Sequence, residues 1–161
     1  MRQLLTTGLL WFSAIGCGLI AGVYFTFSAF VMTALGRIDQ AAGLAAMNAI
    51  NVVILRSLFM PLFLGTTLAG AALALLSLFQ SDEPGAIVTV VGGVTYGLGM
   101  FLVTMIFNVP LNNALAAVDP AGAQGASLWA RYLKEWTFWN HVRTLASLAA
   151  SVLFTLAIAA K

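Results

Sequence analysis

The chain has 161 residues, of which 61% are hydrophobic and 7% are charged, with a formal net charge of +2. Soluble proteins carry about 25% charged residues, so seven basic and five acidic side chains are too few to cover a water-soluble fold of this length. The small charge surplus and the lack of a basic run exclude a nucleic-acid-binding surface. One cysteine, Cys17, excludes an internal disulfide and a multi-thiolate metal site. The composition therefore predicts an integral membrane protein whose main partner is the lipid bilayer.

Four apolar stretches with at most one charged residue each predict membrane spans in one domain, 1–161, at 6–35, 52–79, 86–113 and 136–160. Backbone groups in hydrocarbon must be paired within the structure, and these runs are too long and too evenly apolar for barrel strands. The first span could instead be a cleaved signal peptide. Its apolar run continues some nineteen residues past Cys17, however, which is longer than a signal core. A retained helix is the prediction.

Polar breaks separate the spans. After the break at 37–40, the segment 41–51 predicts a short amphipathic helix that does not cross the membrane. Pro-Gly and Asp-Pro turns follow the second and third spans, and a polar aromatic helix starting near 126 leads into the fourth. The predicted fold is all-α, a bundle of four transmembrane helices with these two additions.

The number of spans also fixes which loops share a side. Most basic residues fall in or beside the loops 37–51 and 119–135, so the positive-inside rule predicts that these loops are cytoplasmic. Two GxxxG pairs, Gly18 with Gly22 and Gly93 with Gly97, predict close helix packing. That packing could lie within one chain or join copies in a homo-oligomer.

Polar residues on the third span recur at multiples of four and share one helix face: Tyr96, Thr104, Asn108 and Asn112. Pro110 stands between the two asparagines and leaves a carbonyl one turn back without its usual partner. Two interpretations stay open. An asparagine amide could satisfy that carbonyl, or the kink could open a polar pocket.

One face of the helix that leads into the fourth span gathers aromatic, amide and guanidinium groups. At 100° per residue these lie within about 80° of one another: Trp129, Tyr132, Trp136, Asn140 and Arg143. His141 lies on the flank of this face, beside Thr144. Tryptophans such as Trp129 and Trp139 are also common membrane-boundary anchors, but anchoring does not explain the polar residues that follow them.

Topology places all these polar groups at one end of the bundle. Asn48, Asn51 and Arg56 precede or begin the second span, Asn108 and Asn112 end the third, and 136–144 begin the fourth. We therefore expect one cavity that they share, because buried polar groups in a membrane are costly and mark functional sites.

The residue types limit the chemistry of that cavity. One histidine, with no carboxylate pair, argues against a metal site within one chain, and no nucleophile–base–orienter trio is present. A haem with one axial histidine stays open. A neutral base beside guanidinium and amide donors suits removal of a proton from a flat apolar carbon acid and stabilisation of the oxyanion. The same groups would suit binding of a quinone or phenol.

Four segments carry a resemblance to a known family: 18–28, 46–51, Asn-Val-Pro-Leu-Asn-Asn at 108–113 and Trp-Thr-Phe-Trp-Asn-His-Val-Arg-Thr at 136–144. They resemble the anthrone oxygenase-like family, small four-helix membrane proteins, many of them bacterial, which are classed as a domain of unknown function. The resemblance implies a bacterial inner (plasma) membrane. It also implies oxidation of anthrones to anthraquinones by molecular oxygen without a metal or organic cofactor.

The resemblance further implies roles for the site residues. His141 would be the base, and Asn140 and Arg143 would complete the catalytic set. Asn108 and Asn112 would help Asn140 and Arg143 to stabilise the enolate and the reduced oxygen. From the helix faces and the topology, and not from the resemblance, we expect the remaining candidates to bind the substrate together with these two asparagines: Asn48, Asn51, Arg56, Tyr96, Thr104, Trp136, Trp139 and Thr144. Two functions stay open, an oxygenase or oxidoreductase acting on an apolar aromatic and a non-enzymatic protein. The second would bind a lipophilic ligand or a partner helix, or assist transport.

Overall fold

The structure is a computed structural model that describes residues 2–161, with side chains from Gln3 onward. Within that range the chain is helical and contains no strand, so the all-α prediction is confirmed. The elements, in chain order, are α1 (Arg2–Thr26), η1 (Phe27–Val31), α2 (Met32–Leu35), α3 (Gln40–Ile54), α4 (Phe59–Leu78), α5 (Ala86–Tyr96), η2 (Gly97–Leu102), η3 (Thr104–Asn108), α6 (Val109–Ala116) and α7 (Ala123–Ala159). The η elements are π-helical turns inside longer helices.

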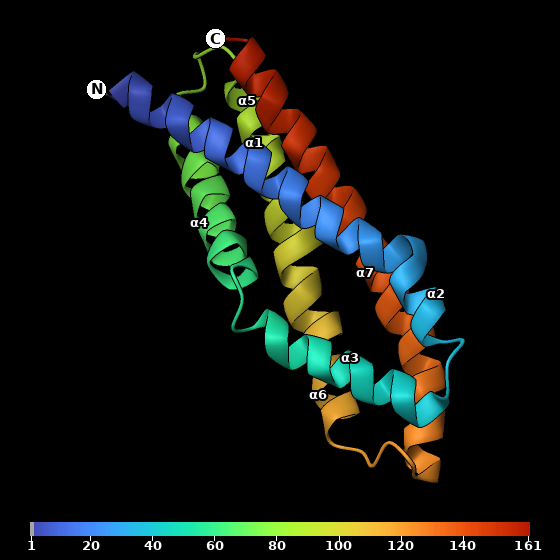
Figure 1. Ribbon diagram of the computed structural model, residues 1–161. Coiled ribbons are helices and arrows are strands. Elements are labelled where there is room, and N and C mark those ends of the chain that lie inside the picture. The colour runs from blue at the N-terminus through green and yellow to red at the C-terminus, as the bar shows by residue number, and fades with distance from the viewer. Residues whose placement is uncertain (1) are drawn as a thin grey trace.

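Four helices have the length and apolarity of membrane spans: Gln3–Leu35, Phe59–Leu78, Ala86–Ala116 and Ala123–Ala159. They run side by side, and both ends of the chain lie at the same end of the bundle (Figure 1). At the other end, α3 crosses in front of α6 (Figure 1). The predicted four-span bundle with a short extra helix is therefore correct.

The second span begins later than predicted, at Phe59 instead of residue 52. Residues 52–54 complete α3, and a turn at 55–58 separates it from α4. The physical reason is Pro61, which has no backbone N–H and is tolerated only in the first turn of a helix. Ser57 supports the new start, because its hydroxyl accepts the N–H of Phe59 at 3.1 Å.

The polar aromatic helix and the fourth span form one continuous helix, α7, of 37 residues. No glycine or proline interrupts the chain between 126 and 159, so nothing breaks the helix between its polar and apolar parts. The first turn of α3 is fixed locally, because the carboxylate of Asp39 accepts the N–H of Ala42 at 3.0 Å.

The core divides into two clusters along the bundle. One lies among α1, α4, α5 and α7 and includes Leu10, Cys17, Leu73 and Phe154. The other packs α3 against the polar end of α7 and includes Leu44, Met47, Leu115, Trp129, Tyr132 and Trp136. Large apolar side chains outside these clusters point outward along the spans, as expected of helices whose outer faces contact lipid.

Only one glycine of each GxxxG pair lies at a helix contact. A Cβ on Gly93 would lie 2.5 Å from the carbonyl oxygen of Gly70, whereas one on Gly97 would meet nothing within 4 Å. A Cβ on Gly18 would lie 3.3 Å from Oγ of Ser151, whereas one on Gly22 would meet nothing within 4 Å. Small residues therefore allow α5 to approach α4, and α1 to approach α7.

Helix lengths indicate where the membrane boundary lies. The 20 residues of α4 extend about 30 Å at 1.5 Å per residue, the thickness of a bilayer core. The 37 residues of α7 extend about 55 Å, so its first part projects beyond the hydrocarbon. We therefore place α3, α6 and the start of α7 at the boundary beyond the N-terminal end of α4.

Candidate functional site

A cavity of about 250 Å³ lies among α1, α3, α4, η3, α6 and α7, at the level where α4 begins. Its walls are mainly aromatic and sulfur-containing side chains: Tyr24, Phe27, Met47, Phe59, Met60, Phe63, Met105 and Trp136. Four other residues bring polar groups into it: Asn51, Thr104, Asn112 and Arg143. An apolar pocket with a few converging polar groups is the usual form of a small-molecule site.

Arg143 is the central polar residue of this cavity and is only 4% exposed. Its guanidinium carbon lies 4.2 Å from the centre of the Tyr24 ring and 4.9 Å from the Trp136 ring. Nη2 donates to Oδ1 of Asn140 at 2.7 Å, and Nη1 donates to the Thr104 hydroxyl at 3.5 Å. Nε is buried without a hydrogen-bond partner. The guanidinium thus contacts two aromatic rings and donates two hydrogen bonds, which leaves some of its N–H groups without an acceptor.

In the part of the chain that the structure describes, no carboxylate lies within ion-pair distance of this guanidinium. Among the described residues, the one ion pair joins Arg131 to Glu135 on the exposed side of α7. Burial of an unpaired charge costs several kcal/mol, and a cation–π contact returns only about 0.5–2 kcal/mol. The partners described for this guanidinium are two aromatic rings, an amide oxygen and a hydroxyl, all of them uncharged.

Asn140 connects the arginine to α1. Its amide nitrogen donates to the backbone carbonyl of Tyr24 and to the hydroxyl of Ser28, both at 2.7 Å. Its oxygen accepts from Arg143. Thr144 lies one turn further along α7, donates to the carbonyl of Asn140 at 2.8 Å and lies 3.3 Å from Ser28. This network is fully buried at Asn140, so it fixes the direction in which the guanidinium points.

Tyr132 links the two elements that close the polar end of the cavity. Its hydroxyl donates to Oδ1 of Asn112 at 2.7 Å and accepts from Nδ2 of Asn51 at 3.4 Å. Its ring stacks between Trp129 and Trp136 at 5.7 Å from each. The aromatic face of α7 predicted from the sequence is therefore the wall against which α3 and α6 are held.

A π-helical turn positions the residues around Pro110. The N–H of Val109 bonds to the carbonyl of Thr104, five residues back, directly before the proline. This wider turn shifts the bonding register where the proline lacks a donor. Asn108 does not repair the kink, because its amide nitrogen donates across the bundle to the carbonyl of Trp136 at 3.2 Å.

The structure brings many of the predicted residues together. Five line the cavity, namely Asn51, Thr104, Asn112, Trp136 and Arg143. Asn140, Asn108 and Thr144 lie directly behind this lining and are buried. Asn48 is half-buried and donates to the carbonyl of Leu115 at 3.2 Å, so it ties α3 to α6.

Other predicted residues lie elsewhere, above all His141, whose side chain is exposed on the outer face of α7. It does not line the cavity, because one residue along a helix turns the side chain about 100° away from Asn140. The structure therefore does not bring His141 into the cavity with the other polar groups. Its role as a base stays a prediction without support from the geometry.

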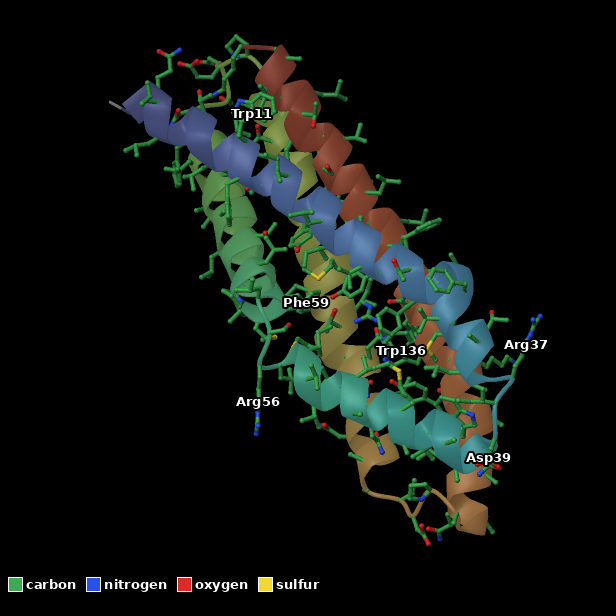
Figure 2. The ribbon with its side chains drawn as sticks, in the orientation of Figure 1. Trp11, Arg37, Asp39, Arg56, Phe59 and Trp136 are labelled. Atoms are coloured by element: carbon green, nitrogen blue, oxygen red, sulfur yellow. The ribbon has the colours of Figure 1, made fainter. Side chains whose placement is uncertain are left out.

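Three more predicted residues stand apart from the cavity. Arg56 lies in the turn after α3, is exposed and points away from the bundle (Figure 2). Tyr96 is buried in the core cluster among α1, α4, α5 and α7. Trp139 stacks on Phe107 with ring centres 3.6 Å apart.

Tyr24 lines the cavity next to Arg143 and was not among the residues predicted from the sequence. It is 4% exposed, its ring lies against Arg143, and its carbonyl accepts from Asn140. The signal was present, because Tyr24 and Ser28 lie four residues apart, on one helix face, inside an uncharged first span. The aromatic residues at the start of α4, including Phe59, are not distinguishable from ordinary lipid-facing residues by spacing. Figure 2 shows Phe59 and Trp136 in the region of the cavity.

Comparison with known proteins identifies one family. The family model described as anthrone oxygenase matches residues 52–153, more than half of the chain. The matched segment contains Thr104, Asn112, Trp136, Asn140 and Arg143, whereas α1 and the cavity residues of α3 other than Ile54 precede it. Comparisons with curated proteins and with solved structures give no match.

Proposed function

The chain belongs to the anthrone oxygenase family, and from that premise we propose that it is a membrane-embedded oxygenase. Its substrate would be a planar, apolar aromatic that carries an oxygen, such as an anthrone, bound in the cavity beside Arg143. Molecular oxygen would be the co-substrate. The observation that carries the proposal is the buried guanidinium of Arg143, which has no carboxylate partner among the described residues and lies in an aromatic-walled cavity.

Oxidation of an anthrone passes through an anion that the guanidinium of Arg143 could stabilise. Oxidation of an anthrone to an anthraquinone removes two hydrogens from the ring CH₂ and places one oxygen atom there, and the other oxygen atom leaves as water. The first step is loss of a proton from carbon, which leaves an enolate with its charge on oxygen. Arg143 could donate to that oxygen, because it lines the cavity and has no carboxylate partner among the described residues. Preorganised donors of this kind typically contribute about 10²–10³ in rate.

The surrounding residues would orient the substrate. The rings of Tyr24, Phe59 and Trp136 offer flat surfaces for an aromatic system. Asn51 and Asn112 add amide groups on the wall formed by α3 and α6. Among the described residues that line the cavity, none is a carboxylate or an imidazole. Stabilisation of the enolate by Arg143 is therefore the main aid to proton loss that the cavity would provide.

The same absence favours a second candidate function. A cavity without a general base could hold a phenol or quinone without changing it, as a binding or transport protein would. The two candidates differ in whether oxygen is consumed, so one measurement separates them.

The test is oxygen uptake by the purified protein in lipid vesicles with anthrone added. An oxygenase should consume one O₂ per anthrone, and Arg143→Gln should lower turnover by about 10²-fold. Arg131→Gln is the matched control, because Arg131 is exposed on the same helix, and it should leave turnover unchanged. Binding of a dihydroxyanthraquinone without oxygen uptake would favour the binding protein. Equal turnover in the wild type and Arg143→Gln would refute the role of Arg143.

A further inference from the structure

Some residues that line the cavity are also exposed at the outer surface of the protein. Among its lining residues, Leu55 is 63% exposed and Met105 is 47% exposed. Leu55 lies in the turn between α3 and α4, and Met105 lies on η3 of the third span. A residue that both lines the cavity and faces outward marks an opening, so the cavity opens sideways, between the α3–α4 turn and the third span.

The rim of this opening is apolar. Ile54, Leu55, Met60, Met105 and Val109 contribute only hydrocarbon and thioether groups. Among the polar side chains of the cavity, Arg143 is almost fully buried, and Asn51, Thr104 and Asn112 are half-buried. An entrance meant for a solute from water would present polar groups at its mouth, whereas this one presents the surface of a lipid-facing helix.

The depth of the opening agrees with its chemistry. The third span begins at Ala86 and the fourth ends at Ala159, both at the end of the bundle opposite α3. Thr104 lies 18 residues from Ala86, and Arg143 lies 16 residues from Ala159. These distances correspond to about 24–27 Å at 1.5 Å per residue, just inside a bilayer core about 30 Å thick. The opening therefore faces the edge of the hydrocarbon layer.

Other parts of the cavity wall are formed by less exposed side chains. On α3, Met47 is buried and Ile50 is half-buried. Phe27 of η1 packs edge-on against Trp136 of α7, with ring centres 5.7 Å apart. Leu55 and Met105 are therefore the lining residues with the most exposed side chains.

From these observations we infer that the opening between Leu55 and Met105 is a lateral portal through which a lipophilic aromatic passes from the bilayer into the cavity. The ligand enters with its oxygen leading toward Arg143, and its most apolar part stays at the portal. This inference rests on the proposed ligand site but not on the oxygen chemistry. A protein that only bound a phenol or quinone would use the same portal.

The test modifies the portal in protein embedded in vesicles. In a Cys17→Ala background, Met105→Cys and Leu55→Cys are each treated with N-benzylmaleimide. Ile106→Cys and Leu58→Cys are the matched controls, because both neighbours are exposed but neither lines the cavity. Stopped-flow quenching of tryptophan fluorescence then follows the binding of a dihydroxyanthraquinone, and Trp136 provides a reporter in the cavity wall.

Modification at Met105→Cys and at Leu55→Cys should slow binding by about tenfold or more, while the modified controls bind at the unmodified rate. Thermal unfolding of each modified protein shows whether it still folds. If one modified portal variant does not fold, the binding rate at the other portal position is compared with its control. If the ligand binds and portal and control positions give equal rates, the portal is refuted and the cavity stands. If the ligand does not bind the unmodified protein at all, the proposed site fails, and the portal fails with it.

Discussion

Asn140 and Arg143 lie one turn apart on α7, and Nη2 of the arginine donates to Oδ1 of the asparagine at 2.7 Å. The same asparagine holds α1 through its amide nitrogen, which donates to the carbonyl of Tyr24 and to Ser28. One side chain thus fixes the direction of the guanidinium and joins two spans. The position of the guanidinium should therefore depend on Asn140 and, through it, on the contact with Ser28.

Replacement of Asn140 by alanine tests this connection. The substitution leaves the carbonyl of Tyr24 and Nη2 of Arg143 without their partners in a buried place. Each such loss costs about 1–3 kcal/mol, so the thermal unfolding temperature in detergent should fall clearly and ligand affinity should fall with it. Ser28→Ala is the control, because it removes only one of the two acceptors and should cost about 1 kcal/mol. Equal stability of Asn140→Ala and the wild type would contradict the network.

Arg143→Met should separate stability from binding. Removal of the guanidinium ends a burial cost of several kcal/mol but leaves Oδ1 of Asn140 without a donor, at about 1–3 kcal/mol. The first effect is the larger, so the ligand-free variant should unfold at a temperature no lower than the wild type. Binding of a dihydroxyanthraquinone, measured by tryptophan quenching, should nevertheless be lost. A large fall in unfolding temperature would mean that Arg143 is mainly structural.

The sequence allowed the four spans, the extra helix and the aromatic face of α7 to be predicted. Those features depend on uncharged runs and on a fixed 100° per residue, which composition and spacing reveal directly. The direction of His141 could not be derived, because it depends on which face of α7 is covered by α1 and by η3. The same holds for Arg56, since the turn that follows Ile54 directs it outward. The π-helical turn before Pro110 leaves no pattern in residue type, so its effect on Asn108 was not predictable.

His141→Ala addresses the base expected from the sequence. The imidazole is exposed on the outer face of α7 and does not line the cavity. The variant should therefore bind a dihydroxyanthraquinone with unchanged affinity and oxidise anthrone within about twofold of the wild-type rate, whereas loss of a positioned general base costs about 10²-fold or more. Loss of turnover with intact binding would restore His141 as the base and would require α7 or its neighbours to rearrange.

Tyr132→Phe tests how α3 is held over the cavity. The change removes the hydroxyl that joins Asn51 on α3 to Asn112 on α6 and keeps the stacked ring. A hydrogen bond of this kind contributes about 1 kcal/mol, so global stability should fall slightly. The larger effect should be local, as faster amide hydrogen exchange in α3 than in α4. Unchanged exchange in α3 would show that apolar packing around Met47 holds this helix alone.

Gly93 and Gly97 form one motif in the sequence but should respond in opposite ways to alanine. A Cβ on Gly93 would lie 2.5 Å from the carbonyl oxygen of Gly70 and 2.8 Å from Cβ of Ala74, so α4 and α5 must separate. Such overpacking costs about 1–3 kcal/mol. A Cβ on Gly97 meets nothing within 4 Å, and alanine in place of glycine inside a helix gains about 0.5–1 kcal/mol. Unfolding temperatures in detergent should therefore fall for Gly93→Ala and hold or rise for Gly97→Ala. If Gly97→Ala were as damaging as Gly93→Ala, that face of the third span would have to contact something outside a single chain, because within the chain it faces open space.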